Sequence, residues 1–282
     1  MSNRNSQANK QAARERMRAE RERQAKKDKI RRQLIVGTSI VAVLGIAAGI
    51  GVAVTKMNSS NGSDSASADG WQSGPKKKKF VAPANTSGKN GTDIIIGKKD
   101  AKKTVEVFED PRCPVCATFE QSTGEKVRKE MEDGKYKLSF TIGTFIDDGI
   151  PGSGSKNALS ALGAAVNVSP EAFLDYKKAL FSPDNHPSEQ DDAFGKDSRL
   201  IEIAQEVPAL KDNASFKKAL KNGTYDPWAL KMSAKFQGVK DISGTPSFKL
   251  NGTKMLAPGG DPRSPITTPE AFDYAYKKAD KK

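Results

Sequence analysis

Both cysteines of this 282-residue chain lie in one four-residue stretch, Cys113 to Cys116. The residues before them, Thr104–Phe108 (TVEVF), alternate apolar and polar side chains as a β-strand does. The residues after them have helical character up to about Met131. Cysteines three apart at the start of a helix occupy neighbouring positions on one turn. The chain is therefore expected to carry a cysteine pair at the junction between a strand and a helix.

Three kinds of site use such a pair: a zinc site, a structural disulfide and a redox-active dithiol. Zinc usually takes four Cys or His ligands, whereas this chain has two cysteines and one histidine, His186, in a polar loop expected at the surface. A disulfide within four residues restricts the unfolded chain little. Residues about 5–6 Å apart can form and break a disulfide with little backbone movement. The spacing favours the dithiol, and neither a metal nor another cofactor is expected.

The two cysteines are expected to differ in reactivity. Cys113 lies at the helix start, where free N–H groups and the helix dipole favour a thiolate. Cys116 lies one turn inside, where shielding keeps its pKa higher. We therefore expect Cys113 to form the mixed disulfide and Cys116 to resolve it. Pro114 fits the first helical turn and supports this geometry.

The N-terminal part of the chain predicts a membrane anchor. Residues 1–33 hold twelve Lys and Arg against four acidic residues, and residues 34–54 hold no charge. At 1.5 Å per residue, this apolar run is long enough for the roughly 30 Å hydrocarbon layer. We predict a single transmembrane helix at 34–55 with the N-terminus in the cytoplasm. A cleaved signal peptide is the alternative, but its apolar core is normally shorter and closer to a cleavage site.

The segments on either side of the apolar run are expected to have simple roles. The basic segment 1–33 has no interleaved aromatic residues, so we interpret it as a topology signal and expect no nucleic-acid binding. Residues 56–90 are rich in Ser, Gly and Asn and are expected to form a flexible linker. Residues 91–282 would then be an extracytoplasmic domain.

The pattern within 91–282 predicts an α/β domain. Short strands are expected at 93–96, 104–108 and 137–144, with a helix between the second and third. Several segments with helical periodicity follow at about 146–240. A strand and hairpin turn (SGTPSFKLNG) and a helix from Pro269 complete the chain. A proline inside such a strand, here Pro246, is awkward unless its peptide bond is cis.

Two stretches in this order resemble DsbA-like thiol–disulfide oxidoreductases: VEVFEDPRCPVC before a helix, and GTPSF about 130 residues later. The resemblance implies a thioredoxin fold with a helical insertion at about 146–240. It places Pro246, as a cis-proline, against the dithiol, and gives the backbone of Thr245 a role in binding substrate. It also implies that the substrates are thiols of exported proteins and that a quinone-linked membrane protein reoxidises the pair.

This sequence departs from the family pattern at three places. Val115 stands where strongly oxidising members have histidine, so we predict a less stabilised thiolate. Val107 occupies the position, six before Cys113, that often carries a buried acid. Glu109, on the same strand face, is the candidate proton shuttle in its place, with a solvated strand end as the alternative.

Arg112 is the third departure, since it replaces an aromatic residue. It is expected either to stabilise the thiolate by its charge or to face solvent.

These observations predict a membrane-tethered, extracytoplasmic protein disulfide oxidoreductase that exchanges disulfides with exported proteins through Cys113 and Cys116. Two alternatives remain open at this point. One is a thiol reductase for cytochrome maturation or thiol rescue, which Val115 allows. The other is a thioredoxin-like binding module without catalysis.

Overall fold

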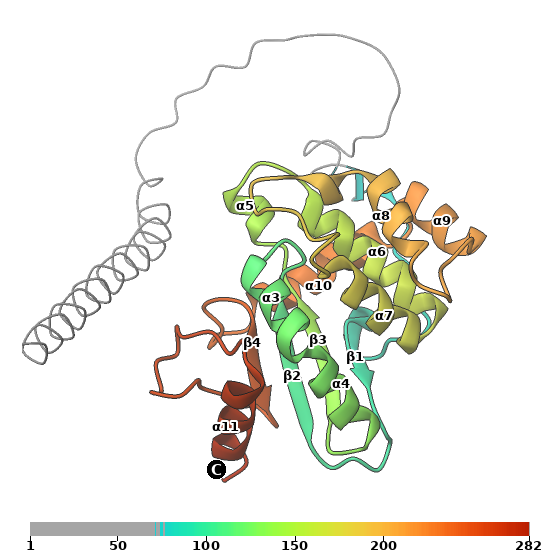
Figure 1. Cartoon of the computed structure of the whole chain (residues 1–282). Helices are drawn as coiled ribbons and strands as arrows, with labels where there is room; N and C mark the ends of the chain where they lie inside the picture. The colour runs from blue at the N-terminus through green and yellow to red at the C-terminus, as the bar shows by residue number, and fades with distance from the viewer. Residues whose placement is uncertain (1–70, 72–73, 76, 282) are drawn as a thin grey trace, which may run out of the picture. The chain divides into compact units, whose positions relative to one another are not determined.

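The computed structural model describes residues 71, 74–75 and 77–281 (Figure 1). The predicted basic segment, the predicted transmembrane helix at 34–55 and most of the predicted linker lie outside these residues. Across the described ranges, no helix is both long and apolar enough to cross a membrane.

A five-stranded mixed sheet organises the part of the chain that bears the cysteines. Its strands run in the spatial order β1-β3-β2-β4-β5, with β2 parallel to β3 and the other neighbouring pairs antiparallel. The strands are β1 (Ile94–Ile96), β2 (Thr104–Glu109), β3 (Lys137–Ile142), β4 (Ser247–Leu250) and β5 (Thr253–Lys254). The central strand is therefore β2, which ends four residues before Cys113.

Helices cover both faces of this sheet. Side chains alternate along β2, so neighbouring residues of this strand pack against opposite faces. On one face lie α3 (Pro114–Phe119), the π-helical turn η2 (Glu120–Gly124), α4 (Glu125–Glu132) and α11 (Pro269–Ala279). There the ring of Phe248 lies 4.6 Å from Phe119 and 5.6 Å from Phe272. On the other face, Phe108 of β2 meets Phe236 of α10 (Asp226–Gln237) edge to face. Val107 and Phe108 thus point into different layers.

Between β3 and β4 the chain forms the helical insertion that the sequence predicts. Its elements are α5 (Ile146–Gly149), α6 (Gly154–Val168), α7 (Pro170–Leu180), η3 (Ala193–Gly195), α8 (Asp197–Ala204), α9 (Ala214–Lys221) and α10. Most of α6 is buried, which fits its many small side chains, and α7 and α10 pack against it (Figure 1). Ser169 accepts a hydrogen bond from the Ala172 N–H and so starts α7 directly after α6.

The residues just before β1, here called the N-terminal strap (84–93), cross the insertion. The side chain of Asn85 donates to the Val166 carbonyl at 2.9 Å, and the Trp228 indole donates to the Gly91 carbonyl at 2.6 Å. Lys235 pairs with Asp93 at 2.8 Å. The sequence predicts a flexible linker up to residue 90, but its described end is held by hydrogen bonds to the helices.

Candidate functional site

The cysteine pair lies where the central strand passes into its helix. Cys113 is the N-cap of α3 with extended backbone angles, and Pro114 is the first helical residue. The Cys116 N–H donates to Cys113 Sγ at 3.4 Å. Cys113 is 6% exposed and Cys116 is fully buried, and both are free thiols. The chain thus presents one thiol at the edge of the site and keeps the other inside.

A segment about 130 residues later completes the mouth of the site. β4 pairs with β2 so that Ser247 lies opposite Phe108, which brings the residues before β4 beside Cys113. The Thr245–Pro246 peptide bond is cis, and the Cys113 thiol donates to the Thr245 carbonyl at 3.5 Å. The structure thus brings Thr245 and Pro246 to the cysteine pair.

The surroundings separate the pKa values of the two thiols. The pKa of Cys113 is lowered, chiefly by a hydrogen bond from the Cys116 thiol and less by the Thr245 hydroxyl and the Cys116 and Val115 N–H groups, against the effect of burial. The pKa of Cys116 is raised well above its usual value, first by burial and then by Cys113. Cys113 is therefore the thiol that ionises first.

Apolar side chains close the site on the side of the insertion. Ile146 and Phe181 are buried in one cluster with both cysteines, and Val115 and Ile150 pack against this cluster while partly exposed. The side chain of Val115 has no donor group to offer a thiolate. Its side chain instead contributes apolar surface next to Cys113.

Glu109 is buried inside the protein. It is 2% exposed, and its carboxylate lies 3.1 Å from the ammonium group of Lys177. Burial raises the pKa of Glu109 to about 7, Lys177 opposes this shift, and the charge of Glu120 adds to it. The charge of Glu109 in turn raises the pKa of Cys116. The alternative of a solvated strand end is therefore wrong, and Glu106, on the opposite face, binds the Gly252 N–H instead.

Lys177 and Glu120 are site residues that the sequence analysis missed. Lys177 comes from α7 of the insertion and is 4% exposed. It has the helical spacing of Phe173 and Leu180, four and three residues away, which are buried in the core. A lysine on the apolar stripe of a helix was the one signal that could have indicated a buried cation. Nothing in the sequence indicates that its partners are Glu109 and Glu120.

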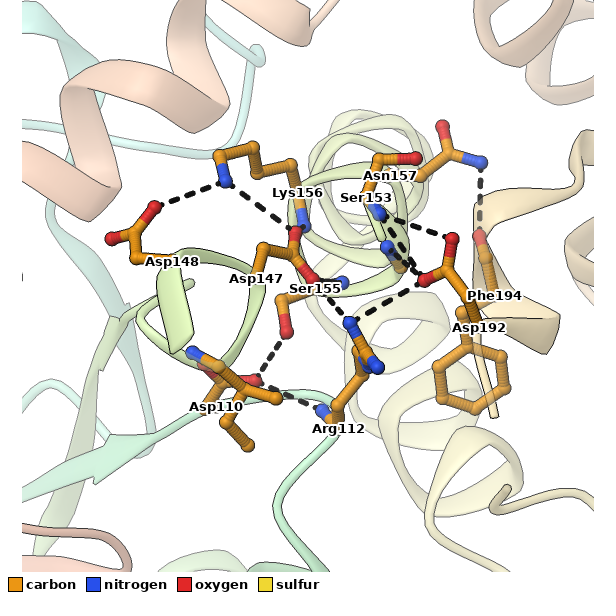
Figure 2. Close-up of polar contacts among 12 residues, drawn as sticks. Asp110, Arg112, Asp147, Asp148, Ser153, Ser155, Lys156, Asn157, Asp192 and Phe194 are labelled. Atoms are coloured by element: carbon orange, nitrogen blue, oxygen red, sulfur yellow. Dashed lines mark hydrogen bonds and ion pairs between the residues drawn. The ribbon is translucent and has the colours of Figure 1, made fainter. Parts of the chain in front are cut away.

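The turn between β2 and Cys113 is held by a second polar cluster (Figure 2). Asp110 accepts hydrogen bonds from the Arg112 N–H, the Ile146 N–H and the Ser155 hydroxyl, the last at 2.6 Å. Burial raises the pKa of Asp110 to about 6, and its three donors oppose this shift. Asp110 therefore fixes the turn before Cys113 to the start of α5 and to α6.

Arg112 points into the insertion, so the expectation that it faces solvent is wrong. Its side chain is fully buried and its guanidinium contacts Asp147 at 2.8 Å and Asp192 at 3.4 Å (Figure 2). Those carboxylates also cap α6, since Asp147 accepts from the Ser155 N–H and Asp192 from the Gly154 N–H. Arg112 thus links the cysteine turn to the N-terminus of the largest inserted helix.

The histidine was expected at the surface but is partly buried. The ring of His186 stacks on Phe181 at 5.5 Å between centroids, and burial lowers its pKa. In the described part of the chain, no three His, Cys, Asp or Glu residues are grouped so that they could hold a metal ion.

Comparison with known proteins finds similarity to thioredoxin and to disulfide oxidoreductases. Residues 89–266 match the family model Thioredoxin_4, described as thioredoxin. The reduced form of a disulfide bond oxidoreductase (DsbG) from Mycobacterium tuberculosis superposes with a TM-score of 0.51 at 25% identity, covering 76% of this chain and 92% of that one.

Two relatives are similar in sequence. The probable disulfide bond formation protein D of Bacillus cereus is 27% identical over 162 residues, which are 57% of this chain and 71% of that protein. The serine/threonine-protein kinase PknE of Mycobacterium tuberculosis is 28% identical over 169 residues, which are 58% of this chain. The match spans only 29% of the kinase's length.

Proposed function

We propose, from the premise that this chain belongs to the thioredoxin family, that it is a thiol–disulfide oxidoreductase whose redox pair is Cys113 and Cys116. The observation that carries the proposal is the position of the Cys113 thiol. It caps a helix, receives an N–H at 3.4 Å and lies 3.5 Å from the carbonyl before a cis-proline. A thiol so placed is accessible to a substrate along the Thr245 backbone, while its partner stays buried.

The exchange conserves electrons and protons without a cofactor. A substrate thiolate attacks Sγ of Cys113 in the oxidised pair, and Cys116 leaves as a thiolate that takes a proton from Glu109. A second substrate thiolate then attacks the substrate sulfur of this mixed disulfide, and Cys113 leaves as a thiolate. Two electrons pass from the substrate to the pair. The low Cys113 pKa favours the second step, and the buried acid Glu109 serves the first.

Trapping of the mixed disulfide tests this assignment. Cys116→Ser should accumulate covalent complexes with partner proteins, because Cys113 can still form the mixed disulfide but Cys116 can no longer attack it and release the partner. Cys113→Ser should accumulate none, because the attacked sulfur is missing. If Cys116→Ser traps nothing and Cys113→Ser refolds reduced proteins as well as the unchanged chain, the chain is a binding module without catalysis.

The substrates are proposed to be thiols of exported proteins, met outside the cytoplasm by a domain tethered through the apolar run 34–54. The family resemblance also implies reoxidation by a quinone-linked membrane protein. Cysteine labelling can test the location, since the chain has only two cysteines. A membrane-impermeant maleimide should label reduced protein in intact cells, and protection until the cells are lysed would contradict the proposed topology.

A second candidate, a reductase, is favoured by Val115, whose side chain cannot donate to the thiolate. The Thr245 hydroxyl acts the other way because it lowers the Cys113 pKa. The reduction potential of the pair, measured against glutathione, decides the direction. A value near that of thioredoxin, about −270 mV, would identify a reductase, and a clearly higher value an oxidant.

A further inference from the structure

One buried lysine lies between two carboxylates behind the cysteine pair. The ammonium group of Lys177 is 3.1 Å from Glu109 and 2.6 Å from Glu120. The rings of Phe140 and Phe181 lie 5.7 Å and 5.1 Å from it. The three charged groups come from β2, α7 and η2, and they carry two negative charges and one positive when all are ionised. The net charge of the three is then −1, which favours the uptake of one proton from solvent.

Only one of the two carboxylates can exchange that proton directly. The side chain of Glu109 is 2% exposed, whereas that of Glu120 is 13% exposed. Glu120 also lines a cavity of about 200 Å³ with exposed residues such as Glu125 and Lys178, and it lines a second hollow that reaches Lys177. Water therefore has access to Glu120 and not to Glu109.

Glu120 also lies well away from the mouth of the site. It is seven residues beyond Cys113, which corresponds to about 10 Å along a helix. A substrate that lies on Thr245 and covers Cys113 therefore leaves the side of Glu120 open. Protons can then enter while the mixed disulfide is in place.

We propose that Glu120 is a positioning residue for the exchange reaction, because it shares Lys177 with Glu109 and is the point at which protons enter from solvent. This inference rests on the proposed function. Lys177 gives one ammonium proton to the Glu109 carboxylate and takes one from the Glu120 carboxyl group, so its own charge is unchanged. Glu109 has by then donated its proton to the departing Cys116 thiolate, and water restores the proton of Glu120.

The groups that set this proton balance are few. Lys177 acts on Glu109 from α7, Glu120 from η2 and Cys116 from α3. Glu120 raises the pKa of Glu109. In Glu120→Gln, Lys177 has Glu109 as its one charged partner in this cluster, so the pKa of Glu109 should fall. We expect its titration midpoint to fall by about one pH unit.

The test compares Glu120→Gln with Glu120→Asp and with Glu125→Gln in the full-length chain. Glu125 is a matched control because it lines the same cavity but is exposed and 3.8 Å from Lys178. Two quantities are measured against pH: the Glu109 carboxyl midpoint by ¹³C NMR, and the single-turnover rate of mixed-disulfide formation with a dithiol peptide. Glu120→Gln should lower the midpoint and slow this step about tenfold above it. Glu125→Gln should change neither, and Glu120→Asp should largely restore both.

The outcomes separate this inference from the function on which it rests. An unchanged NMR midpoint in Glu120→Gln overturns the shared-lysine arrangement whether or not the chain is active. A lowered midpoint with an unchanged rate profile, in a chain that exchanges disulfides, overturns the proton route and leaves the function standing. Failure of the unchanged chain to exchange disulfides overturns both.

Discussion

At the scale of single residues, Thr245 compensates in part for the absence of a side-chain donor at Val115. Its hydroxyl is buried and has no other hydrogen-bond partner among the described residues, and it lowers the Cys113 pKa by donating to the thiolate. Thr245→Val keeps the shape but removes the hydroxyl. We expect the Cys113 pKa to rise and the rate of alkylation at neutral pH to fall about threefold to tenfold. Thiolate absorbance against pH measures the first effect, and Thr245→Ser should reverse both.

Glu109 makes folding stability depend on pH. Its carboxyl titrates near 4.5 when unfolded and at about 7 when folded. The folded state therefore keeps a proton that the unfolded state has lost between these values. The resulting stability is present below pH 4.5 and is lost as the pH rises through 7. We expect the free energy of unfolding of the reduced protein to fall by about 1–3 kcal/mol from this group.

Urea unfolding at pH 5 and pH 8 measures this loss, and Glu109→Gln should make it smaller. Asp110, whose pKa is raised to about 6, contributes a fall of the same sign and remains in the variant. Equal losses in the variant and the unchanged chain would contradict the assignment of the raised pKa to Glu109.

At the scale of elements, Arg112 joins the cysteine turn to α6. Removal of one partner of a buried ion pair leaves an uncompensated charge and typically costs about 3–5 kcal/mol. We expect Arg112→Met to destabilise the protein by about that amount, because Asp147 loses its buried cation while Asp192 is partly exposed. Arg128→Met, at a partly exposed ion pair, should cost about 1 kcal/mol or less. Urea unfolding compares them, and similar losses would show that the Arg112 contacts have no special weight.

The helices and strands of this fold can be predicted from the sequence, while the polar contacts between them cannot. Pro269 starts α11 as predicted, and the alternation in β2 correctly places Glu109 on the face of Val107. These features depend on neighbours within a few residues. The guanidinium of Arg112, by contrast, meets residues 35 and 80 positions away, and Lys177 meets a strand that precedes it by 68 residues. Such contacts form only when the insertion is assembled, so the sequence does not predict the buried surroundings of Arg112.

At the scale of the whole molecule, the insertion and the sheet both contribute residues to the cysteine site. The sheet and α3 supply Glu109 and both cysteines, whereas the insertion supplies Lys177, Phe181 and the carboxylates around Arg112. The predicted thioredoxin fold is confirmed. Changes that loosen the insertion are therefore expected to alter the reactivity of the two thiols as well as stability.

The N-terminal strap fastens the insertion to the start of β1. Asn85→Ala removes its two hydrogen bonds to the end of α6, and each such bond contributes about 1 kcal/mol. We expect a loss of about 1–2 kcal/mol in the free energy of unfolding and faster amide hydrogen exchange in the strap, with the exchange of β2 unchanged. Equal acceleration in β2 would show that the strap and the sheet open together.

The strap also affects how the protein responds to a pulling force. A pull on the chain ahead of residue 71 is met by the buried side chain of Trp71 and the Lys78–Asp226 ion pair, and then by the bonds of Asn85 to α6, of Trp228 to Gly91 and of Lys235 to Asp93. These bonds all lie before β1 in the path of the force. The central strand that leads to the cysteines comes after them. The strap is therefore expected to protect the geometry of the two cysteines from a force applied to the chain ahead of it.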